Sequence, residues 1–237
     1  LYQLAIDAGL SGYAAPLGPL EQGADTFAGQ IPTILKVNSA NSLHAGVGDQ
    51  AITGSVKDAL RIGCVGVGFT IYPGSDVNYG MMEEFREISA EAKANGLVSV
   101  LWAYPRGGNV TKEGETALDI VAYAAHMAAL LGATIIKVKP PKAGVDLAAA
   151  KGAYENVPME TLKDRIAHVM KCCFNGKRLV VFSGGDPKDT DGLLTEIRQI
   201  RDGGGAGSIV GRNSFQRSKP EAMALLDEII KIYKNEA

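Results

Sequence analysis

Short runs of apolar residues alternate along the chain with longer amphipathic stretches, and Gly, Pro, Asn and Asp separate them. A short apolar run between such breaks is typical of a buried strand, whereas the longer stretches have the spacing of helices. This alternation predicts repeated strand–helix units around a parallel sheet. The predicted strands cover residues 12–17, 32–38, 64–72, 97–104, 134–139, 178–184 and 208–211.

Seven strands are one fewer than a closed (β/α)8 barrel, the TIM barrel, requires. Residues 1–10 have apolar positions at helical spacing and end near Gly9, so they are expected to form a helix. We therefore predict an α/β fold of the TIM-barrel class whose first strand lies outside residues 1–237. The alternative is an open sheet that truly starts at Leu1. With 237 residues, 46% of them hydrophobic, the chain is long enough for a single barrel domain over 1–237.

Charge and cysteine content exclude several classes of protein. The 24 basic and 26 acidic residues are spread along the chain, which predicts no nucleic-acid surface. Cys64, Cys172 and Cys173 include an adjacent pair and no CxxC, so we expect neither a disulfide framework nor a zinc site, and we predict a reducing cytoplasm. No apolar run approaches the roughly 20 residues of a membrane span, and no signal-peptide pattern opens the chain.

The stretch "GATIIKVKPP", residues 132–141, places two lysines on a predicted strand. Because side chains alternate along a strand, Lys137 and Lys139 share one face, and Ile136 and Val138 share the face expected to meet the helices. The lysines would then point into the barrel. Two ammonium groups about 6.6 Å apart repel by about 2.5 kcal/mol at an effective dielectric of about 20.

Such repulsion, together with burial, lowers the pKa of a lysine and favours the neutral, nucleophilic amine. A Schiff-base lysine beside a second cation is one such arrangement. The alternative is that one lysine reaches the rim and the other pairs with a carboxylate.

"LWAYPRGG", residues 101–108, follows the preceding predicted strand and places Trp102 and Tyr104 on one face. That face is expected near Lys137, where Tyr104 could exchange a proton with a substrate hydroxyl. Both aromatic residues could instead fill the barrel mouth. On another strand, Lys36 is predicted to face the interior, where it could touch the substrate or form an ion pair.

Two glycine-containing segments, "FSGGDPKD" and "VGRNSFQRS", follow the last two predicted strands. In TIM barrels, the loops at these two places commonly bind a phosphate through backbone N–H groups and a short helix. The alternative is a pair of plain turns. The expected phosphate donors are Ser183, Gly184, Gly185, Gly211 and Arg212.

Two further features complete the prediction. Residues 140–157 form a connection of about 18 residues, long enough for a lid or an assembly segment, or else an inconsequential surface loop. His44, His126 and His168 are scattered, which predicts no metal site.

Taken together, these blocks resemble those of class I fructose-bisphosphate aldolases of the archaeal type, a group that also occurs in bacteria. The resemblance covers essentially the whole chain, and "LWAYPRG" with "IIKVK" is its most specific part. It departs from the family at the first strand, which carries an aspartate that no block of residues 1–237 matches. Asp7 lies on the leading helix and is a different acid.

The resemblance implies that Lys137 forms the Schiff base, Tyr104 is the general acid and base, and Trp102 is the nearby aromatic residue. The substrate would be fructose 1,6-bisphosphate, a sugar phosphate of glycolysis and gluconeogenesis, cleaved without a metal or organic cofactor. Arg106, Lys139 and Lys36 are candidates for the second phosphate. A homo-oligomer such as a decamer is also implied. The alternatives are a related lysine-dependent aldolase or thiolase on another phosphorylated ketose or diketone, a phosphate-site isomerase, and a catalytically silent sugar-phosphate-binding barrel.

Overall fold

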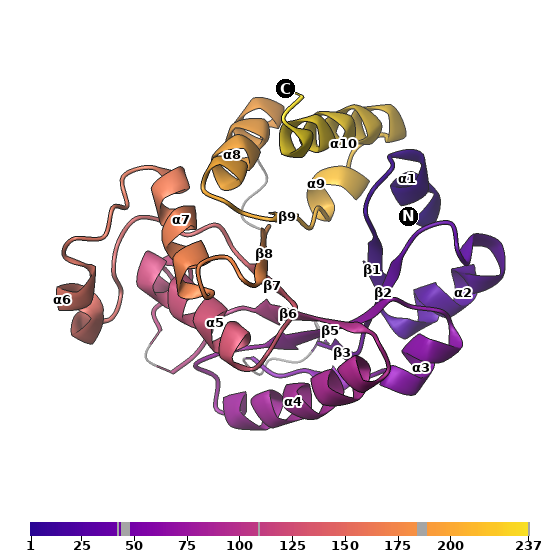
Figure 1. Ribbon diagram of the computed structural model, residues 1–237, viewed down its shortest axis with the longest axis horizontal. Coiled ribbons are helices and arrows are strands. Elements are labelled where there is room, and N and C mark those ends of the chain that lie inside the picture. The colour runs from indigo at the N-terminus through magenta and orange to yellow at the C-terminus, as the bar shows by residue number, and fades with distance from the viewer. Residues whose placement is uncertain (42, 44–47, 109, 184–188, 237) are drawn as a thin grey trace.

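The computed structural model describes residues 1–41, 43, 48–108, 110–183 and 189–236. Within these ranges, seven strands form one parallel sheet in the order β1-β2-β5-β6-β7-β8-β9. The sheet is curled and its helices lie on the outer side, so the predicted TIM-barrel-type arrangement is confirmed (Figure 1). Each strand overlaps a predicted one: β1 (Tyr13–Ala15), β2 (Thr33–Lys36), β5 (Gly66–Ile71), β6 (Val98–Ala103), β7 (Ile135–Val138), β8 (Leu179–Phe182) and β9 (Gly207–Ser208).

Helices follow the strands as the sequence predicts. Three begin with a capping box, in which a Ser or Thr and the acid three residues later bond each other's backbone N–H groups: Ser55 with Asp58, Thr161 with Asp164, and Ser218 with Glu221. The main helices are α1 (Tyr2–Asp7), α2 (Leu17–Phe27), α3 (Val56–Arg61), α4 (Asn78–Ala94), α5 (Leu118–Leu130), α7 (Leu162–Cys172), α8 (Thr190–Asp202) and α10 (Lys219–Lys234).

The core lies between the sheet and the helices. Alternate strand residues, among them Phe69, Leu101 and Ile136, are fully buried on the helix-facing side. Phe69 of β5 meets Phe85 of α4 with ring centroids 5.9 Å apart. Each such buried side chain contributes about 1.5–3 kcal/mol, and the helix-facing face of the strands is thereby fixed. The opposite face is left to line the barrel interior.

Elements that the sequence did not predict lie in the connections. An antiparallel pair, β3 (Asn38–Ser39) and β4 (Ala51–Ile52), follows β2. The connection over residues 140–157 contains a short 3-10 turn, η2 (Ala148–Ala150), and helix α6 (Lys151–Tyr154). Asp119 of α5 holds the middle of this connection, since its carboxylate accepts from the N–H groups of Asp146 and Leu147. The lid or assembly role of this segment stays a prediction.

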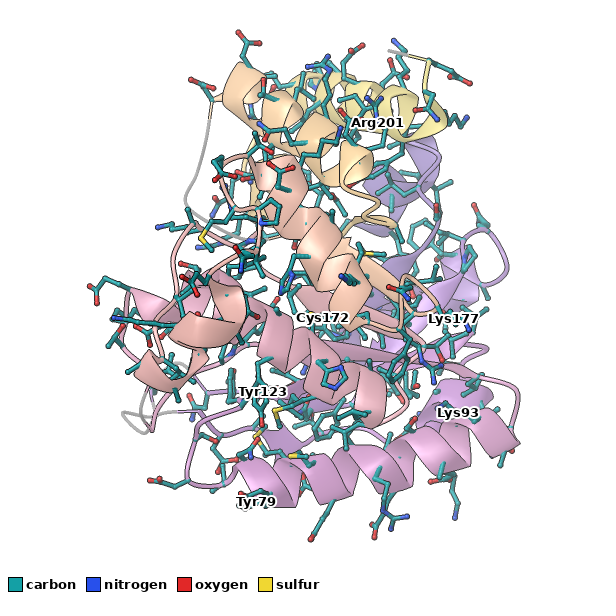
Figure 2. All side chains as sticks on the ribbon, turned by 60° about the vertical axis from the view of Figure 1, so that its left-hand side comes forward. Tyr79, Lys93, Tyr123, Cys172, Lys177 and Arg201 are labelled. Carbon is teal, nitrogen blue, oxygen red and sulfur yellow. The ribbon has the colours of Figure 1, made fainter. Side chains whose placement is uncertain are left out.

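The outer helical surface exposes some large aromatic side chains. Tyr79 of α4 is 78% exposed and Tyr123 of α5 is 63% exposed (Figure 2). In the part of the chain that the structure describes, no helix has both the length and the hydrophobicity needed to cross a membrane.

Candidate active site

The register of the parallel sheet aligns the key side chains of three strands. Thr70 of β5 pairs with Trp102 of β6, which pairs with Lys137 of β7. Paired residues of neighbouring parallel strands share a face, so Trp102 and Lys137 lie on the same interior side of the sheet, and Tyr104 follows two residues further on. The expectation that Trp102 and Tyr104 face the lysine strand is confirmed.

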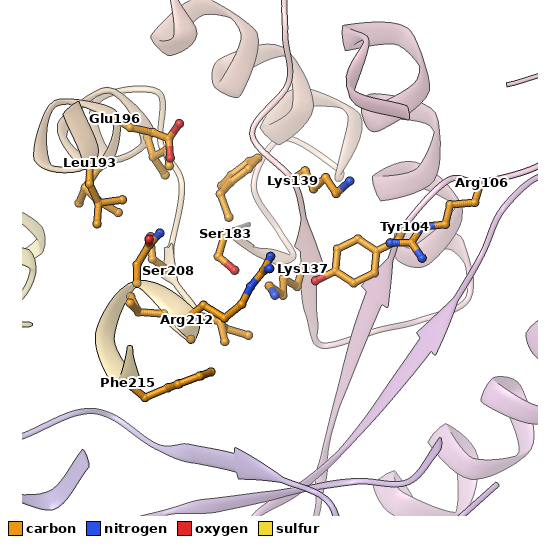
Figure 3. A pocket seen from close by; sticks show the side chains of 17 residues that line it. Tyr104, Arg106, Lys137, Lys139, Ser183, Leu193, Glu196, Ser208, Arg212 and Phe215 are labelled. Carbon is orange, nitrogen blue, oxygen red and sulfur yellow. The ribbon is translucent and has the colours of Figure 1, made fainter. Parts of the chain in front are cut away.

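A cavity of about 560 Å³ opens at the C-terminal end of the strands. The hydroxyl of Tyr104, the amine of Lys137 and the guanidinium of Arg212 point toward one another in it (Figure 3). Of the residues nominated from the sequence, those that line the cavity are Tyr104, Arg106, Lys137, Lys139, Ser183, Gly211 and Arg212. Trp102 and Lys36 are not among the lining residues, and Gly184 and Gly185 lie outside the described residues.

Lys137 is a buried amine that faces this cavity. The residue is 9% exposed, and burial lowers the pKa of its amine to about 8. At pH 7 about one amine in ten is then neutral, against about one in a few thousand for an exposed lysine. Its Nζ lies 5.4 Å from the centroid of the Tyr104 ring. The side chain therefore combines nucleophilicity with a neighbouring phenol.

Lys139, two residues further along, has a different partner. Its Nζ lies 3.5 Å from Oε2 of Glu115, whose other oxygen is 2.9 Å from Nζ of Lys112. Lys139 is directed away from the Lys137 amine (Figure 3). Of the two predicted causes of a lowered pKa at Lys137, burial is confirmed, whereas repulsion from Lys139 is not among the causes. The alternative in which one lysine of the strand pairs with a carboxylate describes Lys139 correctly.

Tyr104 follows β6 directly and is held by a backbone bond from its N–H to the Ile71 carbonyl, 3.1 Å away. Burial raises the pKa of its phenol above the usual value, and the positive charge of Arg106 opposes that rise. The resting side chain is therefore a neutral phenol that can donate a proton. Its hydroxyl points toward Lys137 (Figure 3).

Trp102 lies on the same face beneath Tyr104. The indole is 8% exposed and covers Gly68 of β5 so closely that a Cβ at that glycine would lie 2.2 Å from the ring. Only a glycine leaves room for the indole there. The ring thus forms part of the packed interior, directly beside Lys137 in the sheet.

The two predicted phosphate segments contribute side chains to the same cavity. Ser183 follows β8, and its backbone N–H is already bonded to the Val138 carbonyl at 3.2 Å. Its hydroxyl therefore remains as the donor toward a ligand. Gly211 precedes the short helix α9 (Arg212–Phe215), and the Arg212 guanidinium extends into the cavity (Figure 3). The two segments thus meet where one anion could contact both.

Lys36 lies on the interior face of β2, as predicted, but its amine has protein partners. Its Nζ donates to the backbone and side-chain oxygens of Asn38 and, at 2.8 Å, to Oε1 of Gln50. Burial lowers the pKa of Lys36 to about 7, while these oxygens favour the charged form. A role of Lys36 in substrate binding stays a prediction. The partners of its amine in the described residues are amide oxygens, not the carboxylate that the alternative of an ion pair requires.

Sequence reasoning missed Glu115, Gln50 and Tyr72. Glu115 stands in the acidic stretch "KEGET", where nothing sets it apart from the neighbouring Glu113. Gln50 lies in a loop without periodicity, and Tyr72 ends a predicted strand, where an aromatic residue is ordinary. Within the described residues, no three His, Cys, Asp or Glu side chains come together as a metal site would require.

Comparison with known proteins places the chain in a family. The family model for DeoC/LacD family aldolase matches residues 1–217. The class 1 fructose-bisphosphate aldolase of Thermoproteus tenax is 35% identical over 218 residues, 92% of this chain and 73% of that protein. The class 1 enzyme of Halobacterium salinarum is 31% identical over 237 residues, 100% of this chain and 81% of the relative.

Comparison with a solved structure shows that the fold is also similar to that of an aldolase. An archaeal fructose-1,6-bisphosphate aldolase, with its catalytic lysine bound covalently to the carbinolamine intermediate of the substrate, superposes with a TM-score of 0.81. It is 31% identical in sequence, and the match covers 98% of this chain and 81% of that one. The chain belongs to the DeoC/LacD family of aldolases.

Proposed function

We propose that the protein is a class I fructose-bisphosphate aldolase that cleaves fructose 1,6-bisphosphate reversibly into dihydroxyacetone phosphate and glyceraldehyde 3-phosphate. The observation that carries the proposal is a buried amine of lowered pKa, Lys137, in one cavity with the Tyr104 phenol and the Arg212 guanidinium. The relatives named as class 1 fructose-bisphosphate aldolases support the choice of substrate.

Lys137 begins the reaction as the nucleophile. Its neutral amine attacks the ketone carbon, C2, and the resulting carbinolamine loses water to give an iminium. Tyr104, a neutral phenol in the resting enzyme, donates the proton that the departing hydroxyl requires. The phenolate that remains then accepts the proton of the C4 hydroxyl.

The positive iminium and the Tyr104 phenolate together allow carbon–carbon cleavage. As the C4 hydroxyl loses its proton, the C3–C4 bonding electrons move into the iminium and form an enamine, and glyceraldehyde 3-phosphate leaves. Protonation of the enamine at C3 and hydrolysis of the imine release dihydroxyacetone phosphate and regenerate the Lys137 amine. Each proton that Tyr104 accepts is returned within the cycle.

Binding of the phosphate groups positions the ketone beside the amine. Ser183, Gly211 and Arg212, with Gly184 and Gly185 as predicted further donors, would hold the phosphate nearer the ketone. Arg106 and Lys139 line the same cavity and are candidates for the second phosphate. Such positioning can contribute several kcal/mol to lowering the barrier.

Borohydride trapping tests the proposal directly. After incubation with dihydroxyacetone phosphate and reduction, the Lys137 peptide is expected to gain the mass of the reduced adduct. The variant Lys137→Met should gain none and should lose cleavage activity, while Lys139→Met should still be trapped at Lys137. Full-rate cleavage by the Lys137→Met variant would exclude the mechanism.

We also propose a cytoplasmic homo-oligomer. Support for self-association comes from the outer side of α5, where Tyr123 is 63% exposed and Leu130 is 65% exposed on a helix whose one charged residue, Asp119, is buried. Three free thiols, Cys64, Cys172 and Cys173, suit a reducing compartment. Sedimentation of the wild type against Tyr123→Glu tests the first part, since a charge on this face should dissociate the oligomer.

A further inference from the structure

Arg106 carries a charge at the cavity that no carboxylate neutralises within the described residues. It follows β6 by three residues, and its backbone N–H donates to the Pro73 carbonyl at 2.9 Å. Its guanidinium carbon lies 5.1 Å from the centroid of the Tyr72 ring, and its Nε is buried without a hydrogen-bond partner in the described ranges. The guanidinium is therefore supported by an aromatic face, which leaves its charge available to an anionic ligand.

Tyr72, the residue that supports Arg106, is itself fixed in place. It follows the last residue of β5 and is 5% exposed. Its hydroxyl accepts a hydrogen bond from Nε2 of Gln50 at 2.7 Å. A ring held at its hydroxyl end cannot tilt away from the guanidinium without breaking this bond.

Lys36 determines which way the Gln50 amide faces. An ammonium group only donates hydrogen bonds, so the Gln50 atom 2.8 Å from Lys36 must be the amide oxygen. The amide NH2 group is then directed at Tyr72, and the tyrosine oxygen must act as the acceptor. The chain of contacts therefore has one direction, from Lys36 through Gln50 to Tyr72.

The origin of this chain is anchored to the sheet. Asn38, which accepts from Lys36, is fully buried and exchanges two hydrogen bonds of 2.9 Å with the backbone of Thr70. Thr70 stands two residues before Tyr72 on β5. The contacts thus join three parts of the chain: β2, β5 and Gln50, which lies just before β4. The last residue in this series, Tyr72, contacts the Arg106 guanidinium.

We infer that Lys36, Gln50 and Tyr72 form a positioning network that holds the Arg106 guanidinium at the cavity, beside Tyr104. The inference rests on the proposed function, because Arg106 would meet an anionic group of the sugar phosphate. None of the three network residues lines the cavity, so they act through Arg106 and not by touching the substrate.

A double-mutant cycle tests the kinetic consequence. Tyr72→Phe keeps the ring but removes the acceptor, and Gln50→Met keeps the side-chain length but removes both hydrogen bonds. Each is expected to lower kcat/KM for fructose 1,6-bisphosphate by about 2- to 30-fold, the range that cation–π energies span, and mostly through KM. In an Arg106→Met background the same changes should shift kcat/KM by less than about twofold.

Tyr154→Phe is the matched control. It removes a half-buried tyrosine hydroxyl, 3.2 Å from Nε2 of His168, away from the cavity, and should leave kcat/KM unchanged. Equal effects of Tyr72→Phe with and without Arg106 would overturn the inference, because a merely structural role gives additive losses.

A measurement without turnover separates this inference from the proposed function. The order parameter of the Arg106 Nε–H bond, measured by NMR on protein labelled at arginine Nε, should be near that of rigid backbone, about 0.85, in the wild type. It should fall below about 0.6 in Tyr72→Phe and in Gln50→Met. An unchanged order parameter in both variants would overturn the network. If the wild type fails to cleave the sugar, the proposed function falls and this measurement alone decides on the network.

Discussion

Replacing Glu115 by Gln should make Lys137 more reactive at neutral pH. Glu115 lies 3.5 Å from Lys139 and compensates its charge. Without that carboxylate, the charge of Lys139 would repel that of Lys137, by at most about 2.5 kcal/mol at an effective dielectric of about 20, the value for two ammonium groups about 6.6 Å apart whose side chains do not diverge. A neighbouring cation lowers the pKa of a lysine, so the shift is downward, and 2.5 kcal/mol corresponds to almost two pKa units. Partial exposure of Lys139 screens the repulsion, so we expect about one unit.

The assay is the initial rate of borohydride-trapped adduct at Lys137 with dihydroxyacetone phosphate, measured against pH. For the wild type, the rate should rise with pH and level off with a midpoint near 8, where burial places the pKa of Lys137. For Glu115→Gln, the midpoint should move to about 7, which raises the neutral fraction at pH 7 from about one in ten to about one half. The rate at pH 7 should therefore increase about fivefold.

Two controls isolate the charge of Lys139. Glu113→Gln removes an exposed carboxylate from the same segment and should leave the midpoint near 8. Adding Lys139→Met to Glu115→Gln removes the uncompensated cation and should return the midpoint toward that of the wild type. A midpoint that stays in place or moves upward in the single variant would refute the electrostatic reasoning.

The remaining predictions concern stability and the proton carrier. Lys137→Met should raise the free energy of unfolding at pH 7 by up to about 3 kcal/mol, because the fold holds the pKa of Lys137 near 8 instead of 10.5. This gain should be complete below pH 8 and vanish as the pH rises toward 10.5, and urea titrations at several pH values will measure it. Tyr104→Phe should still form the trapped adduct, but more slowly because water must then protonate the departing hydroxyl, and should slow carbon–carbon cleavage by about 10²- to 10⁴-fold; an unchanged kcat would assign the proton to another group. Gly68→Ala should destabilise the protein by about 1–3 kcal/mol because the new Cβ meets the Trp102 ring, whereas Gly80→Ala, with open space around it on α4, should stabilise it by about 0.5–1 kcal/mol. Thermal melts of both variants compare the two glycines, and equal shifts would contradict the packing of Trp102.

The strands and their faces could be predicted because they follow from local patterns. Ile136 and Val138 are apolar at a spacing of two, which places Lys137 on the opposite face, and the structure buries both apolar residues against the helices. The pairing of Trp102 with Lys137 follows once neighbouring parallel strands are in register. These features need only the period of a strand and the order of the sheet.

The partners of the lysines could not be predicted in the same way. Gln50 lies 14 residues from Lys36 and 22 from Tyr72, and Glu115 lies 24 residues before Lys139. Such pairs depend on how loops fold over the ends of the strands, and no periodicity in the sequence sets that geometry. The sequence therefore indicated that charged side chains enter the barrel but not how each charge is compensated.

Three lysines lie on the interior face, and their different partners explain why only one of the three is suited to attack a carbonyl. Lys36 is surrounded by oxygens of Asn38 and Gln50, which favour its ammonium form, and Lys139 lies beside the carboxylate of Glu115. For Lys137, by contrast, no hydrogen bond or ion pair joins its Nζ to another residue of the described ranges, and an aromatic ring is its near neighbour. Burial lowers the pKa of Lys36 further than that of Lys137, to about 7 against about 8, so the pKa alone does not single out Lys137. The Lys137 amine differs because it faces the cavity without a hydrogen-bond partner in the described ranges, whereas the Lys36 amine is held by Asn38 and Gln50 and does not line the cavity. Of these three lysines, Lys137 is thus the one suited to attack a carbonyl, because its amine reaches the cavity and no other described residue bonds to it.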